Sequence, residues 1–148
     1  MVAQAMIAAV GLERERAFAQ CIKLGGNPNQ IKVNKQIPLV FHLVDRNLDA
    51  FILDCKGAST PLDLKVKHPL VKLTPMLYAA SGTKTTPAVI QALVKLGASP
   101  NSRGERNKTA LMYAAGSGNE AVVKTLLKAG ADPKAVDAEG KTYLDYEK

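Results

Sequence analysis

Apolar residues recur with a helical period in two stretches of the second half of the chain. In residues 89–94 the apolar side chains stand at positions i, i+1, i+4 and i+5, and residues 122–127 repeat this spacing. The spacing places these side chains on one face, so each stretch predicts an amphipathic helix. A glycine, Gly97 or Gly130, follows each stretch, as expected where a helix ends in a left-handed residue.

A second helix is predicted upstream of each of these. Residues 74–80 read Thr-Pro-Met-Leu-Tyr-Ala-Ala, and residues 109–115 read Thr-Ala-Leu-Met-Tyr-Ala-Ala. Their alanine pairs leave room for neighbouring helices to lie close together. Gly97 and Gly130 are 33 residues apart, and an offset of twelve residues to the next helix start recurs after Gly25, Gly97 and Gly130. The chain is therefore built from a repeated pair of helices.

This pattern resembles the ankyrin-repeat family, which has a period of 33 residues and a Thr-Pro-Leu-x-x-Ala-Ala signature. The resemblance implies an all-α solenoid of about four helix-turn-helix units with β-hairpin fingers, a degenerate N-terminal unit and a truncated C-terminal cap. At 148 residues we expect a single domain, 1–148. Its units are expected at about 1–27, 28–59, 70–99 and 100–132, with a cap at 133–148 and a long finger at 60–73.

Composition suits a thin layered fold, because 47% of the residues are hydrophobic but only four Tyr and three Phe are aromatic. There are two cysteines. Cys21 aligns with core leucines of later units and is expected to be buried, whereas Cys55, two residues before a terminating glycine, is expected to be more exposed. Two free thiols are favoured, and a disulfide in an oxidising compartment is left open.

The formal net charge of +7 is concentrated in the connections between units. The connections 26–36, 57–73 and 98–108 each carry a formal charge of +2, whereas the connection 131–141 carries −1. In ankyrin folds these connections are the fingers that line one edge of the concave surface. The charge predicts a positive stripe that docks an acidic protein, and a solvated edge that only keeps the protein soluble is the alternative.

The long finger is five residues longer than the other connections. Leu62, Leu64 and Val66 alternate with polar residues, which predicts a strand, and His68-Pro69 predicts a turn before a returning strand. We expect a projecting hairpin that contacts a partner, with a harmless insertion packed on the third unit as the alternative. The candidate contact residues of this finger are Leu62, Leu64, Lys65, Lys67, His68 and Lys72.

Further contact residues are expected on the next finger and at the helix-helix turns that border the groove. They are Arg103, Arg106 and Lys108 on the finger, and Val44, Asp45, Ser81 and Ser117 at the turns. An insertion at residues 83–87 lengthens one turn, either to touch a partner or to cap the following helix. Equivalent positions of successive units hold aromatic rings that serve either the scaffold or a partner. These are Phe41, Tyr78, Tyr113 and Tyr146.

No metal-ligand spacing, glycine-rich phosphate loop or nucleophile-base arrangement is recognisable, so we predict no enzyme, no metal and no cofactor. The resemblance implies protein-protein interaction. A stand-alone module of this kind suits an inhibitor, an adaptor or an immunity-type protein that neutralises a toxic enzyme. Nucleic-acid binding, suggested by a pI near 9.5, is disfavoured because the basic residues are interleaved with aliphatic rather than aromatic ones.

No stretch is long enough to span a membrane, and residues 1–10 are apolar but lack a positively charged start. We therefore expect a cytoplasmic protein. We also expect it to be monomeric when alone. A periplasmic or secreted location is left open, because a leader removed from the sequence would not be visible.

Overall fold

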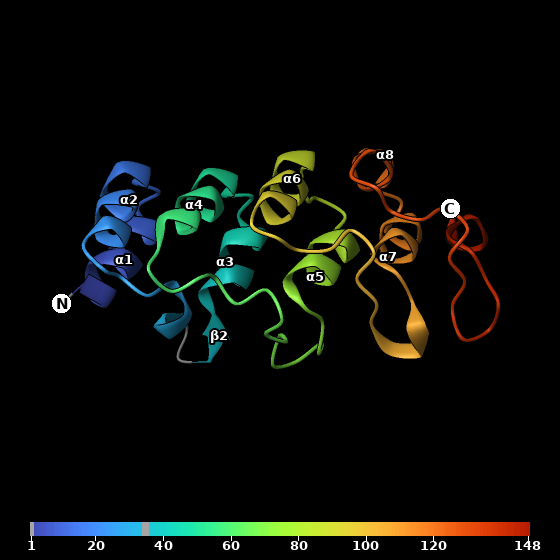
Figure 1. Ribbon diagram of the computed structural model, residues 1–148, viewed down its shortest axis with the longest axis horizontal. Helices are drawn as coiled ribbons and strands as arrows, with labels where there is room; N and C mark the ends of the chain where they lie inside the picture. The colour runs from blue at the N-terminus through green and yellow to red at the C-terminus, as the bar shows by residue number, and fades with distance from the viewer. Residues whose placement is uncertain (1, 34–35) are drawn as a thin grey trace.

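The computed structural model describes residues 2–33 and 36–148 as two layers of helices in a single row, with the two termini at opposite ends (Figure 1). One layer contains α1 (Val2–Gly11), α3 (Leu39–Asp45), α5 (Pro75–Ser81) and α7 (Ala110–Ser117). The other contains α2 (Glu15–Lys23), α4 (Asp49–Asp54), α6 (Pro87–Lys95) and α8 (Glu120–Lys128). The all-α solenoid expected from the sequence is confirmed.

Short elements lie in the connections between the helix pairs. Strands β1 (Lys32–Val33) and β2 (Ile37–Pro38) form an antiparallel ladder in which Val33 pairs with Ile37. A single antiparallel bridge joins Arg103 to Thr109 in the equivalent finger of a later unit. The remaining elements are the 3-10 turns η1 (Pro28–Gln30), η2 (Cys55–Gly57), η3 (Glu105–Asn107) and η4 (Tyr143–Tyr146).

The helix ends follow from local chemistry. Pro75 opens α5, where its missing N–H leaves no hydrogen bond unmade. Thr109 caps α7 by accepting a hydrogen bond from the backbone N–H of Met112 through its hydroxyl. Gly97 and Gly130 follow α6 and α8 with φ of 102° and 101°, a region that side chains disfavour. The sequence expectation that these glycines end helices is confirmed.

The core runs along the row between the two layers. The alanine pairs of α5 and α7 are buried and let these neighbouring helices pack directly against each other. Ile90 of α6 and Leu126 of α8 are wholly buried beneath them, in agreement with the helical spacing. Each helix pair thus covers the apolar face of the next, which is how a stack of small units obtains a continuous core.

Both cysteines lie in this core as free thiols. The expectation for Cys21 is confirmed, but that for Cys55 is wrong, because its thiol lies within the turn that ends α4 and donates to the carbonyl of Phe51 at 3.3 Å. Burial, followed by the neighbouring Asp54, raises the pKa of the Cys55 thiol to about 12. A thiol held protonated in this way is a poor nucleophile.

Candidate functional site

The long finger folds as an extended segment and a turn, and not as the hairpin that the alternation predicts. Residues 62–66 form no ladder with another segment in the part of the chain that the structure describes. The alternation appears as burial instead: Leu62 is buried, Leu64 and Val66 pack against the core, and the polar residues between them are exposed. The apolar face of this finger therefore belongs to the scaffold, which corrects the expectation that Leu62 contacts a partner.

His68 continues this alternation into the protein interior. It is only 6% exposed, its ring stacks on Tyr78 with a centroid distance of 5.1 Å, and it meets Phe41 edge-on at 5.0 Å. The expectation that His68 occupies the tip of the finger is therefore wrong. The ring instead fastens the finger to α3, which carries Phe41, and to α5, which carries Tyr78.

A tight turn follows His68 and forms the true tip. The N–H of His68 donates to the carbonyl of Leu73 at 2.9 Å, and the N–H of Lys72 donates to the carbonyl of His68 at 2.9 Å. Leu70 is 81% exposed and Val71 is 51% exposed. We call Leu70 and Val71 the apolar tip. Neither residue is among the individual contact residues expected from the sequence.

Exposed lysines lie on the first finger, residues 26–36, and on the long finger. Lys65, Lys67 and Lys72 of the long finger and Lys32 of the first finger form what we call the basic finger edge. All four are exposed, and among residues 2–33 and 36–148 no acidic side chain lies within ion-pair distance of any of them. Their positive charge is therefore available to a partner, in contrast to charge that is neutralised within the protein.

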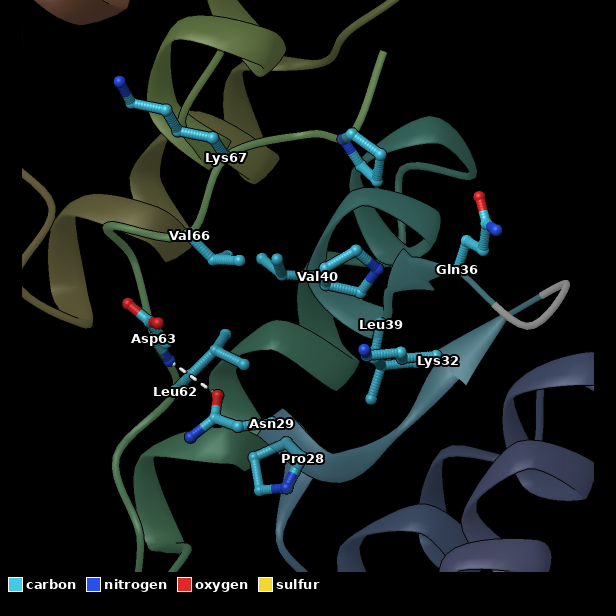
Figure 2. Close-up of a pocket in the computed structure, with 12 residues that line it drawn as sticks. Pro28, Asn29, Lys32, Gln36, Leu39, Val40, Leu62, Asp63, Val66 and Lys67 are labelled. Atoms are coloured by element: carbon cyan, nitrogen blue, oxygen red, sulfur yellow. Dashed lines mark hydrogen bonds between the residues drawn. The ribbon is translucent and has the colours of Figure 1, made fainter. Parts of the chain in front are cut away.

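Two hollows lie on either side of Lys67. The first has a volume of about 290 Å³ and lies between the first and the long finger, with Lys32 and Lys67 among its lining residues. Figure 2 shows Val40 and Val66 facing each other across it, while Lys67 extends away from them. One wall is fixed by Asn29, whose side chain accepts from the N–H of Asp63 at 2.7 Å. The hollow is lined by apolar side chains such as Val40 and Val66, and by the charged residues Lys32, Lys67 and Asp63.

The second hollow, of about 250 Å³, lies between the long finger and the third finger, residues 98–108. Lys67, Lys72 and Arg103 line it, with Glu105 as the one acidic residue. Three cations against one carboxylate make this hollow attractive to an anionic group.

The cationic side chains of the third finger, in contrast to the lysines of the long finger, contact other parts of the protein. Arg103 donates to the carbonyl of Asn107 at 3.0 Å and to that of Val136 at 2.9 Å. Arg106 pairs with Glu139 at 3.3 Å, and the ammonium of Lys108 lies 4.7 Å from the centre of the Tyr146 ring. All three residues expected to contact a partner therefore have partners within the C-terminal cap.

A family model for ankyrin repeats, in three copies, matches residues 29–137. The chain belongs to the ankyrin-repeat family. Ankyrin repeats generally mediate protein-protein interaction, and the family is typically non-catalytic. A search of curated proteins finds no similar sequence.

The helix-turn side of the ankyrin stack is largely committed to internal hydrogen bonds. Val44 is buried, which corrects its assignment as a contact residue, and Asp45 accepts from the Tyr78 hydroxyl at 2.7 Å. The hydroxyls of Ser81 and Ser117 donate to backbone carbonyls of their own helices, at 2.8 Å in each case. These three polar residues therefore hold the turns in place.

The insertion at residues 83–87 is held from both sides. Asn47 donates to the carbonyl of Lys84 and accepts from the N–H of Thr86, at 3.1 and 3.0 Å. From the next ankyrin unit, Asn119 donates to the carbonyls of Gly82 and Thr85, at 3.2 and 2.9 Å. These bonds favour the structural interpretation of the insertion over a contact with a partner.

The aromatic positions of successive ankyrin units serve the scaffold to different degrees. Phe41 is wholly buried, whereas Tyr78, Tyr113 and Tyr146 are half-buried. Burial, together with the hydrogen bond to Asp45, raises the pKa of Tyr78 to about 12. The hydroxyl of Tyr146 donates to Asp137, and that bond raises the pKa of Tyr146 to about 12. Three of the four rings thus have identified structural partners.

Chemical sites are not evident in the ankyrin stack. Among the described residues no group of three or more His, Cys, Asp or Glu side chains is placed to hold a metal ion. Over the same residues, none of the helices has both the length and the apolar character needed to cross a bilayer.

Proposed function

We propose that this chain is a protein-binding module that docks an acidic protein surface through its basic finger edge. The observation that carries this proposal is a set of four exposed lysines that form no ion pair with an acidic side chain of the described residues. Three of them, Lys32, Lys67 and Lys72, line two hollows, and the exposed apolar pair Leu70 and Val71 lies on the same finger as two of these. Electrostatic complementarity over such an edge raises the rate of association and selects among partners. The module would act by occupying its partner, as an inhibitor, an adaptor or a neutralising protein does.

The first experiment is affinity capture from a lysate of the source organism with two matched baits. The test bait carries Lys32→Glu, Lys65→Glu, Lys67→Glu and Lys72→Glu. The control bait carries the same change of charge at the ends of α2, α6 and α8 and in the turn η2 after α4. Its substitutions are Lys23→Glu, Lys56→Glu, Lys95→Glu and Lys128→Glu, at residues that are all exposed. Arg103 and Arg106 are left intact because they hold the C-terminal cap.

The proposal predicts one stoichiometric acidic protein on the unmodified and control baits, and its loss from the test bait. Capture of nuclease-sensitive material alone would favour a nucleic-acid-binding solenoid instead, whose affinity would fall steeply with salt and would not depend on the nucleic-acid sequence. Equal loss from both charge-reversed baits would mean that only net charge matters, and would contradict docking through the finger edge.

A further inference from the structure

The apolar tip has the exposure of an interface anchor. Leu70 and Val71 are adjacent in sequence, and both extend into solvent from a finger whose other apolar side chains pack on the core. Leu24, at 67% exposed, is a comparable surface leucine elsewhere on the protein, but it stands alone at the end of α2. Scattered single leucines on a surface are ordinary, whereas contiguous exposed apolar surface with polar residues at its rim marks interaction sites.

The tip is also held in one conformation before any partner binds. Nδ1 of His68 accepts hydrogen bonds from the N–H groups of Leu70 and Val71, at 3.2 and 3.5 Å. Lys72 takes a left-handed backbone conformation, with φ of 58°, that closes the turn. The ring of His68 is itself fixed by the stacking on Tyr78. An anchor that is already ordered loses little conformational entropy on binding.

The positive charge beside Leu70 and Val71 indicates which residues a partner should carry around the pocket that receives them. Lys67 and Lys72 flank the tip, and together with Arg103 they line the adjacent hollow of about 250 Å³. A partner that seats Leu70 and Val71 must therefore bring these cations to the rim of its pocket. Carboxylates at that rim would neutralise them. A basic rim would repel the lysines, and a wholly apolar rim would desolvate them without supplying an opposite charge.

We propose that Leu70 and Val71 are a preorganised anchor that inserts into an apolar pocket on the partner protein, and that acidic residues on the rim of this pocket meet Lys67 and Lys72. His68 is the positioning residue of the anchor. The inference rests on the proposed function, since it assigns the decisive contact within that docking edge.

The test places a photoreactive benzophenone side chain at position 70, with position 24 as the matched control. Irradiation in a lysate of the source organism should give one discrete adduct at position 70 and none at position 24. The crosslinked protein is then identified, purified and titrated against variants of the full chain. Leu70→Ser with Val71→Ser should weaken the affinity about 100-fold, as expected for two anchor residues, whereas Leu24→Ser should leave it unchanged.

Lys67→Glu with Lys72→Glu should weaken the affinity roughly tenfold or more at low salt, and less at high salt. A partner that binds one-to-one but tolerates Leu70→Ser with Val71→Ser would overturn the anchor and leave the proposed function standing. A partner pocket without acidic residues would also overturn the inference. Failure to find any saturable protein partner would overturn both.

Discussion

The long finger and the third finger occupy equivalent positions in successive repeats and carry the same formal charge of +2. In the third finger, Arg103, Arg106 and Lys108 all contact the C-terminal cap. In the long finger, no acidic side chain of the described residues pairs with Lys65, Lys67 or Lys72, and His68 is a buried polar residue. Equal charge therefore serves stability in one finger and is free for recognition in the other.

The difference follows from what each finger has beside it. The third finger lies next to a cap that supplies Glu139, the carbonyl of Val136 and the ring of Tyr146. The long finger lies between the first and third fingers, both of which carry a net positive charge. Glu105 lines the same hollow as Lys67 and Lys72, but no ion pair joins the lysines of the long finger to an acidic side chain of the described residues. The long finger is held to the stack by apolar packing, by the aromatic contacts of His68 and by the hydrogen bonds of Asn29 to Pro61 and Asp63, and its lysines remain exposed.

The strongest challenge to this comparison is His68→Ala. Removing a buried ring that stacks on Tyr78, and with it the acceptor for two backbone N–H groups, should lower the free energy of unfolding by roughly 2–4 kcal/mol. Chemical denaturation measures the loss, and hydrogen exchange should show faster exchange of the Leu70 and Val71 amides. His42→Ala is the control, because His42 is only half-buried and should have a smaller effect. Equal effects would mean that His68 does not fasten the finger.

The second prediction concerns pH and the cap to which the third finger is attached. Asp137 is buried and accepts from the Tyr146 hydroxyl and from the N–H groups of Glu139 and Lys141, at 2.8 and 3.0 Å for the two backbone bonds. The Tyr146 hydroxyl, followed by these N–H groups, holds the pKa of Asp137 below its ordinary value of 3.8. The stabilisation of the folded state by the Asp137 carboxylate is therefore fully present above about pH 4, and it is lost as the pH falls through the lowered pKa of Asp137 in the folded state.

Tyr146 sets the upper end of the pH range in which this hydrogen bond stabilises the folded state, since its pKa is raised from 10.0 to about 12. The stabilisation that it contributes is present below pH 10 and is lost as the pH rises toward 12. Thermal unfolding of the wild type and of Asp137→Asn as a function of pH measures both limits. The two proteins should converge at acid pH. A constant difference between them down to pH 2 would contradict the assigned role of the carboxylate.

Much of this fold could be predicted from the sequence because the signals for a helix pair lie within a short stretch of the chain. The spacing of residues 89–94, the alanine pairs and the terminating glycines each depend on contacts within one repeat or with its nearest neighbour. The burial of Cys55 could not be predicted in the same way, because α4 ends in a 3-10 turn that directs the thiol inward. Proximity to a glycine indicates where a helix ends, but not which side of it faces the core.

The site was harder to predict, for a physical reason that the long finger illustrates. Strict alternation predicts which side chains share a face, and that was right for Leu62, Leu64 and Val66. It does not say whether that face pairs as a strand or packs on helices. Continued by two residues, the same alternation would have placed His68 inside, so a signal for its burial was present. The exposure of Leu70 depends on the turn, which breaks the alternation.

The third prediction contrasts Arg103→Ala with Lys67→Ala. Loss of the guanidinium removes two hydrogen bonds to carbonyls, one of them across to the cap, and should lower the free energy of unfolding by about 1 kcal/mol, a value kept small because the side chain is exposed. Lys67→Ala should leave it within about 0.5 kcal/mol. Denaturant titration measures both. A larger loss for Lys67→Ala would reverse the assignment of the two fingers.

The smallest expected effect is that of Lys108→Met, which keeps most of the side-chain stem but removes the cation over the Tyr146 ring. The free energy of unfolding should fall by roughly 0.5 kcal/mol, the magnitude of an exposed cation–π contact. Lys65→Met removes the same charge from the long finger and should have no measurable effect on unfolding, yet it should slow association with the partner. If Lys108→Met lowers stability without slowing association, and Lys65→Met slows association without lowering stability, the same change of side chain would distinguish a lysine that stabilises the stack from one that recognises a partner.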